Sequence, residues 1–291
     1  MKNINNLKNE IRIAFLDIDG VLTPTPDYIP GEVPNITNGS ISTLKKLAQK
    51  GFKTVFITAR GANELRGNGG LEELLKKHSI LENSMIFCSE GLDQATYDFD
   101  FKLKNNKPIF RNGNVILEKK PMIKRETFGN IDKFLLYKML LGKEIKQELK
   151  YKGFKIRSAI NEKLTTDARI FFQLENNTIK ERKRFVVAAR EITNKMEETF
   201  RLTKKFGSPV ELDVIDIVAG ITIKPKTLGK HFAVLRALNL LKIKTNDKIT
   251  GYAFGDSDSD SMMKIRNDIE FIKIKNNKDF IKQVDKITSK V

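Results

Sequence analysis

The segment that most constrains the fold is a short apolar run that ends in two acidic residues. Residues Ile11–Leu16, interrupted by one arginine, lead directly into an Asp-Ile-Asp-Gly sequence. Side chains alternate along a strand, so Asp17 and Asp19 start on the same side before the chain turns at Gly20. Two carboxylates this close repel unless a cation neutralises them or one stays protonated. The segment predicts a metal-assisted nucleophile with a neighbouring acid/base, or alternatively an Asp that caps a strand-ending turn.

The composition of the 291-residue chain is that of a globular protein long enough for more than one domain. Hydrophobic residues make up 40%, and 19 Phe residues supply bulk for a core. The single cysteine, Cys88, excludes an internal disulfide, and no segment has the roughly 20 consecutive apolar residues of a membrane helix. Residues 1–12 are polar where a signal peptide is apolar. We therefore expect a cytoplasmic protein without a membrane partner.

The charge of the chain favours anionic partners. The formal net charge is +17 and the pI is near 9.7, so the protein attracts phosphorylated metabolites, nucleic acids or acidic membranes. The lysines are scattered, and neither an RNP-like aromatic run nor a Cys/His finger accompanies them. We expect a small anionic phosphorylated substrate and no specific nucleic acid. A non-catalytic basic nucleic-acid-binding protein is the alternative from another functional class.

Apolar strands and amphipathic helices alternate in the first and last parts of the chain. Beyond the first strand, the predicted elements are strands at 53–57, 84–88, 249–254 and 269–272 and helices at 40–50, 71–77 and 229–241. This order is typical of a parallel sheet with helices on both faces. We predict an α/β fold with a doubly wound, Rossmann-like parallel core.

The middle of the chain has a different pattern. From residue 92, aromatic and basic residues alternate, and further on the sequence predicts a long charged helix at 180–199 and strands at 169–174 and 210–214. We predict that residues 1–91 and 223–291 form the core and that residues 92–222 form an inserted α+β domain.

Acidic and hydroxyl side chains follow three of the predicted core strands. Asp17 and Asp19 follow the first strand, Thr58 follows the strand at 53–57, and a Gly-Asp-Ser-Asp-Ser-Asp segment at 255–260 follows the strand at 249–254. Open α/β sheets bind ligands at the carboxyl ends of their strands. The sequence therefore predicts one site at this edge of the sheet.

The three alternating Asp residues at 256–260 also match the start of an EF-hand calcium loop. That interpretation fails, because Ser261 stands where the loop needs Gly, Asn267 stands where it needs Glu, and a strand precedes the segment instead of a helix. With Asp256 beside Asp17, the site offers carboxylate oxygens and no His or Cys. Such a donor set suits Mg²⁺ and not zinc.

These segments resemble the haloacid dehalogenase superfamily of phosphohydrolases, whose four motifs occur here in order. The matching segments are Asp17-x-Asp19-Gly20-x-Leu22, Thr58 after a buried strand, Lys230 in Gly-Lys-His-Phe-Ala-Val-Leu, and Gly255-Asp256-x-x-x-Asp260. The insertion is similar to a type II cap, which implies that it determines substrate specificity. Thr-Ala-Arg at 58–60 and Cys-Ser-Glu-Gly at 88–91 resemble the subclass of trehalose-, sucrose- and mannosylglycerate-phosphate phosphatases, Cof-type sugar phosphatases and phosphomannomutases.

The chain departs from the pattern of this subclass at two positions. Ala59 stands where the subclass usually has Gly, and His231 stands where Gly commonly follows the motif lysine. Neither change removes a reacting group. The departures therefore concern substrate contact more than the chemistry.

The resemblance implies a role for each motif residue that acts on the phosphoryl group. Asp17 attacks phosphorus and becomes an aspartyl phosphate, and Asp19 protonates the leaving alcohol and then activates water. Thr58 and Lys230 hold the phosphoryl oxygens. Lys226 is a rival for the motif lysine, but Lys230 opens a predicted helix and is followed at the family's spacing by an alanine.

The resemblance also implies a metal site and substrate contacts. Asp17, Asp256 and the backbone carbonyl of Asp19 hold Mg²⁺, and Asp260 orients Lys230 or a metal-bound water from behind. The residues implied in substrate binding are Gly20, Ala59 and Arg60.

Together these patterns predict a Mg²⁺-dependent phosphomonoesterase that acts on a small phosphorylated metabolite, with a sugar phosphate as the expected substrate. A phosphomutase with the same nucleophile is the alternative within the family, although Thr-Ala-Arg does not resemble the mutase pattern. The sequence makes no prediction of the oligomeric state.

Overall fold

The computed structural model describes residues 11–290 except 25–31, 67, 68, 92, 102, 105, 106, 109, 112, 113, 116, 126–128, 160–168, 177, 203–210, 218, 219 and 227. The polar segment 1–10 and Leu92, the predicted first residue of the insertion, lie outside the described residues. Within the part that is described, no helix is long and apolar enough to cross a membrane.

The first half of the main sheet follows the predicted alternation of strands and helices. The elements are β1 (Ile11–Leu16), α1 (Asn38–Gln49), β2 (Phe52–Ile57), α2 (Ala62–Leu65), α3 (Leu71–Lys77) and β3 (Ser84–Cys88). A Thr37 side chain caps α1 by accepting a hydrogen bond from the amide of Ser40, and Gly51, at φ +79°, turns the chain into β2.

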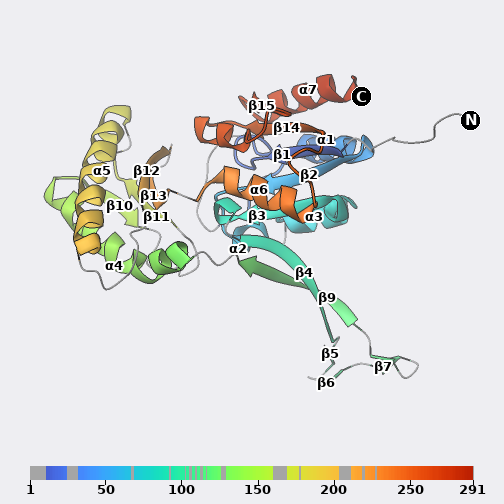
Figure 1. The fold of residues 1–291 in the computed structure, drawn as a ribbon, viewed down its shortest axis with the longest axis horizontal. Coiled ribbons are helices and arrows are strands. Elements are labelled where there is room, and N and C mark those ends of the chain that lie inside the picture. The colour runs from blue at the N-terminus through green and yellow to red at the C-terminus, as the bar shows by residue number, and fades with distance from the viewer. Residues whose placement is uncertain are drawn as a thin grey trace, which may run out of the picture.

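The last part of the chain returns to the same sheet through α6 (Lys230–Leu240), β14 (Ile249–Gly255), β15 (Ile269–Lys273) and α7 (Asn277–Thr288). The strand order is β15-β14-β1-β2-β3-β4-β9, and the first five strands are parallel. Figure 1 shows this sheet with helices on both sides.

The apolar side chains of the sheet divide between two hydrophobic clusters. Ala14 and Leu16 pack with residues of α1, α3 and α7, whereas Ile13 and Phe15 pack with residues of α6. Alternate residues of β1 thus face opposite layers, as the period of a strand requires. This confirms the predicted doubly wound α/β core.

The sheet extends further than predicted, into the segment assigned to the insertion. β4 (Asp93–Phe101) pairs antiparallel with β3, and β9 (Leu117–Arg125) pairs antiparallel with β4. Short strands lie between them: β5 (Leu103–Lys104), β6 (Lys107–Pro108), β7 (Phe110–Arg111) and β8 (Asn114–Val115). β4 and β9 therefore form a hairpin of the main sheet that projects from it in Figure 1.

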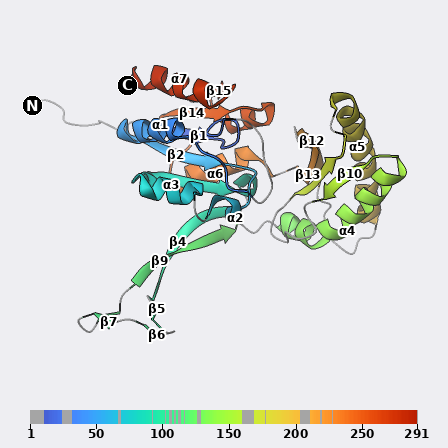
Figure 2. The ribbon, with the colours of Figure 1, turned by 180° about the vertical axis from the view of Figure 1, so that it is seen from behind.

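A second, smaller sheet lies in a lobe made by residues 129–225, called the second lobe below. Its elements are α4 (Gly129–Tyr151), β10 (Ile156–Ala159), β11 (Ile170–Leu174), α5 (Ile179–Leu202), β12 (Leu212–Ile217) and β13 (Gly220–Pro225). The sheet is antiparallel in the order β10-β11-β13-β12 and shares a hydrophobic cluster with α4 and α5. Figure 2 shows this lobe set apart from the main sheet. The sheets thus divide the chain near residues 128 and 226, whereas the sequence placed the division at 92 and 222.

Candidate active site

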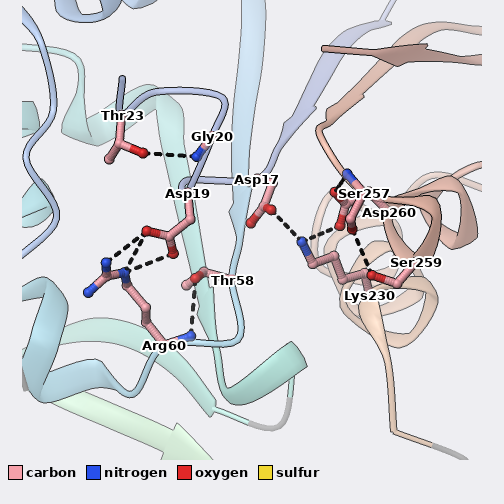
Figure 3. Close-up of polar contacts among 10 residues, drawn as sticks. All are labelled: Asp17, Asp19, Gly20, Thr23, Thr58, Arg60, Lys230, Ser257, Ser259 and Asp260. Carbon is pink, nitrogen blue, oxygen red and sulfur yellow. Dashed lines mark hydrogen bonds and ion pairs between the residues drawn. The ribbon is translucent and has the colours of Figure 1, made fainter. Parts of the chain in front are cut away.

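The site begins where β1 ends. The amide of Asp17 donates to the carbonyl of Phe254 (3.0 Å), which keeps the end of β1 beside the end of β14. The chain then turns at Gly20, at φ +74°, whose amide donates to Oγ1 of Thr23 (2.9 Å; Figure 3). A Cβ on Gly20 would lie 2.4 Å from a carboxylate oxygen of Asp256. The turn therefore needs glycine for its backbone conformation and for the approach of Asp256.

Lys230, the first residue of α6, joins two of the predicted acidic residues. Its Nζ lies 2.8 Å from Oδ2 of Asp17 and also forms an ion pair with Oδ1 of Asp260. The other oxygen of Asp260 accepts a hydrogen bond from the amide of Ser257 (2.9 Å), and Asp260 is fully buried (Figure 3). The rival Lys226 is exposed and pairs with Glu211 at 3.3 Å. The structure thus brings Lys230, and not Lys226, to the nucleophile candidate.

Carboxylate oxygens of Asp17, Asp256 and Asp260 lie within 4.8 Å of one another. This donor set contains only hard oxygen ligands, so these residues fit Mg²⁺. Both oxygens of Asp260 are engaged, Oδ1 by Lys230 and Oδ2 by the amide of Ser257, whereas Lys230 contacts Oδ2 of Asp17. Asp17 and Asp256 are therefore the better metal ligands of the three. The predicted ligation by the backbone carbonyl of Asp19 stays a prediction.

Burial and neighbouring charges shift the pKa values of these acids in different directions. Burial raises the pKa of Asp17 to about 8, although the Lys230 ammonium acts in the opposite direction. Burial and the Asp260 carboxylate raise the pKa of Asp256 to about 6. Burial also disfavours the charge of Asp260, but Lys230 and the hydrogen bonds from Ser257 outweigh it and lower the pKa of Asp260. The pKa of Lys230 is raised, because Asp17 and Asp260 outweigh the effect of its own burial. A divalent cation beside Asp17 and Asp256 favours their ionised forms.

The loop after β2 carries the remaining predicted residues. Thr58 is buried and its Oγ1 accepts a hydrogen bond from the amide of Arg60 (3.1 Å), while Ala59 is half-buried. One edge of the Arg60 guanidinium forms a bidentate pair with the Asp19 carboxylate: Nε donates to Oδ2 (2.9 Å) and Nη2 donates to Oδ1 (2.7 Å; Figure 3). Its Nη1 donates to the backbone carbonyl of Glu32 (2.6 Å). In this structure Arg60, predicted to bind substrate, positions Asp19.

Comparison with solved structures shows three similar proteins of the same overall architecture. Aspergillus fumigatus trehalose-6-phosphate phosphatase is 14% identical with a TM-score of 0.51, covering 97% of this chain and 94% of that one. Plasmodium falciparum IMP-nucleotidase is 16% identical with a TM-score of 0.54, covering 96% of this chain and 68% of that one. The C-terminal domain of Candida albicans trehalose-6-phosphate phosphatase is 12% identical with a TM-score of 0.56, covering 97% and 94%. The chain has a haloacid dehalogenase fold.

No protein-family model and no curated protein matches the chain, so the fold assignment rests on structure. In this fold the three predicted segments after β1, β2 and β14 meet at one edge of the sheet, and α6 brings its first residue to the same edge. The roles of the individual residues stay predictions.

Three contributors to this site were assigned no structural role from the sequence. Thr23 holds the amide of Gly20, and the backbone carbonyl of Glu32 holds Arg60. A Thr three residues after a turn glycine is a weak signal for such a contact. A backbone acceptor such as Glu32 leaves no signal in the residue type. The third contributor is the turn at Ser89–Gly91, whose amides donate hydrogen bonds to backbone carbonyls of the Thr58 loop.

Proposed function

We propose that this protein is a Mg²⁺-dependent phosphomonoesterase that hydrolyses a small phosphorylated metabolite through an aspartyl phosphate on Asp17. One observation carries the proposal: the buried carboxylate of Asp17, with the Lys230 ammonium 2.8 Å away, stands beside Asp256 at the carboxyl end of β1. A carboxylate flanked by a fixed cation and a second acid suits attack on a phosphoryl group. The similarity in fold to phosphatases supports the same activity.

In the first step an Asp17 oxygen attacks phosphorus, the bond from phosphorus to the ester oxygen breaks, and Asp19 gives its proton to the leaving oxygen. In the second step water attacks phosphorus, Asp19 takes the proton, and the acyl phosphate bond to Asp17 breaks to release phosphate. Lys230 and the Thr58 hydroxyl stabilise the negative phosphoryl oxygens in both steps. Asp260 keeps Lys230 in place.

Mg²⁺ held at this site would supply positive charge that offsets the charge of the phosphoryl oxygens and would favour the ionised form of Asp17. Asp17 and Asp256 are the side chains that would hold it. Burial raises the pKa of both acids, and a divalent cation between them would favour their ionised forms.

A sugar phosphate is the substrate class that we propose, because two of the similar proteins are trehalose-6-phosphate phosphatases. The similarity to an IMP-nucleotidase makes a nucleoside monophosphate the competing class. We assign the choice between them to the second lobe. The cytoplasmic location, the phosphatase outcome over the mutase outcome, and the expectation of no specific nucleic-acid partner stay predictions.

A phosphate-release screen tests this function. Purified full-length protein is incubated with sugar phosphates, nucleoside monophosphates and phosphoglycerates, with Mg²⁺ and with EDTA. We expect release from sugar phosphates above all, none in EDTA, and recovery when Mg²⁺ is returned. Turnover of every class in EDTA, or no release from any ester with Mg²⁺, would contradict the proposal. Nucleic-acid binding that persists in 0.5 M salt, together with no release, would favour the non-catalytic alternative.

A further inference from the structure

The turn that follows β3 has a strained backbone and contacts both the Thr58 loop and α6. Ser89, Glu90 and Gly91 follow β3 with φ values of 49°, 56° and 95°. All three are buried. A left-handed backbone is rare for two successive residues with a Cβ, and it persists only where the surroundings hold it. The turn is therefore fixed by its contacts, and those contacts show what it supports.

The first part of the turn holds the loop that carries Thr58 and Arg60. The amide of Ser89 donates to the carbonyl of Arg60 (2.8 Å), and the amide of Glu90 donates to the carbonyl of Thr58 (2.9 Å). These two bonds fix the backbone on both sides of Ala59. The turn thus fixes the positions from which the Thr58 hydroxyl and the Arg60 side chain, which pairs with Asp19, reach the site.

The last part of the turn holds the helix that carries Lys230. A Cβ on Gly91 would lie 2.7 Å from Cβ of Ala233, so α6 packs directly on the glycine. The Arg236 guanidinium donates to the carbonyl of Gly91 and lies 5.3 Å from the centre of the Phe87 ring. The same turn therefore fixes both the Thr58 loop and α6.

A buried ion pair ties this turn to the second lobe. The Glu90 carboxylate contacts the ammonium of Lys224, and their side chains are 11% and 6% exposed. Lys224 belongs to β13, the strand that leads from the second lobe back to Lys230. Burial and the nearby Lys230 ammonium lower the pKa of Lys224. Each charge depends on the other, since either one alone would be buried without a counter-charge.

We infer that Glu90 and Lys224 are positioning residues of the catalytic site and that their ion pair couples the end of the second lobe to the Thr58 loop and α6. The expected loss of kcat rests on the proposed phosphatase function. The expected loosening of the turn rests on the contacts above alone. Neither residue touches the reacting atoms. Breaking the pair frees the turn, so Thr58, Arg60 and Lys230 lose their alignment while the groups that bind substrate stay present.

The test uses the full-length protein with Glu90→Gln, Lys224→Met and the double variant. Turnover of para-nitrophenyl phosphate at saturating Mg²⁺ gives kcat and KM, and hydrogen exchange reports the amides of Ser89 and Glu90. We expect each single variant to lower kcat at least tenfold with KM within threefold of wild type. The exchange of these two amides rises at least tenfold, while amides of β1 and β2 keep their wild-type rates. The kcat of the double variant falls no further than that of the more affected single variant, because the pair acts as one unit.

The matched control is the neighbouring pair of Lys226 and Glu211, whose side chains are 65% and 61% exposed. Lys226→Met and Glu211→Gln remove the same two charges from an exposed pair, and Lys226 directly follows β13, the strand of Lys224. We expect kcat within twofold of wild type and wild-type hydrogen-exchange rates at Ser89 and Glu90. Wild-type kcat and wild-type exchange at Ser89 and Glu90 in the variants would overturn the inference. A uniform rise in exchange across β1 and β2 as well would also overturn it, because the pair would then serve stability alone.

Two further outcomes are separated by this design. If the single variants do not fold, the double variant, which buries no unpaired charge, tests the inference. Its kcat and the hydrogen exchange of Ser89 and Glu90 are then compared with wild type. If the wild-type protein hydrolyses no phosphate ester, the proposed function fails. The exchange measurement then still confirms or overturns the coupling of Glu90 and Lys224 to the turn.

Discussion

The four aspartates of the candidate site lie in four different environments. Asp17 is buried beside an ammonium, and Asp19 is held by the guanidinium of Arg60. Asp256 packs against the Gly20 turn, and Asp260 is buried against Lys230. On the proposed function, these differences in burial and partner, and not in residue type, would separate a nucleophile from an acid/base, a metal ligand and a support.

The nucleophile is tested by Asp17→Asn, which keeps the shape of the side chain and removes the attacking charge. We expect kcat for the best substrate to fall by about a thousandfold or more, because one group of a unit that acts together is lost. Phosphate release under saturating Mg²⁺ is the measurement. Asp258→Asn is the matched control, since that side chain is 95% exposed and pairs only with Lys273 at the surface in the described part of the chain. More than a tenth of wild-type kcat in Asp17→Asn would refute the assignment.

The pH dependence of Mg²⁺ binding follows from the two raised pKa values. Burial raises the pKa of Asp17 to about 8 and that of Asp256 to about 6, so at pH 6 a proton occupies Asp17 and, in about half of the molecules, Asp256. Mg²⁺ binds the ionised forms and must displace the protons. We expect the affinity for Mg²⁺ to rise from pH 6 to pH 8 and to level off above pH 9. Calorimetry in buffers of different ionisation enthalpy measures the affinity and the protons released. An affinity that is constant from pH 6 to pH 8 would contradict these pKa values.

At the scale of elements, the site depends on turns that place strand ends and a helix start together. The apolar runs of β1, β2 and β14 predicted these strands from sequence alone, because a buried strand needs little else. The spacing of acidic residues after them predicted which edge of the sheet matters. The contact between Arg60 and Asp19 was not predictable, because spacing does not determine the rotamer of a long side chain.

Gly20 and Gly51 separate the backbone role of a turn glycine from its role in the site. Both have positive φ, but a Cβ would meet Asp256 at Gly20 and nothing within 4 Å at Gly51. We expect Gly51→Ala to lower the free energy of unfolding by about 1 kcal/mol and to leave Mg²⁺ affinity unchanged. Gly20→Ala displaces Asp256 as well, so Mg²⁺ affinity falls at least tenfold. Denaturant unfolding and calorimetric titration measure the two effects, and equal Mg²⁺ affinity in both variants would refute the placement of Asp256.

At the scale of the whole molecule, the chain has two lobes with separate cores. One hydrophobic cluster lies entirely within residues 141–223, and two others fill the faces of the main sheet. The sequence predicted an insertion but did not indicate that β4 continues the main sheet antiparallel to β3 and that β9 pairs with β4, because strand pairing leaves no signal in residue type. The pair of Glu90 and Lys224 was equally invisible, since 134 positions separate the two residues and lysine is common in this chain.

Separate cores predict two calorimetric unfolding transitions. Ile145→Ala in the second lobe and Leu44→Ala in the main core each remove a fully buried side chain, at a cost of about 2–5 kcal/mol. We expect each substitution to lower the midpoint of one transition only. Mg²⁺ at a hundred times its dissociation constant stabilises the main core by about 2.7 kcal/mol and leaves the other transition in place. A single transition that moves with both substitutions would contradict two independent cores.

The central claim, that Asp17 carries the phosphoryl group, is tested most directly by trapping the enzyme during turnover. Full-length protein is mixed with Mg²⁺ and a substrate labelled in its phosphoryl group, quenched in acid within milliseconds and digested. We predict one labelled peptide, containing Asp17, whose label hydroxylamine releases as expected for an acyl phosphate. Label on any other residue, or rapid phosphate release with no labelled protein at any quench time, would contradict the account.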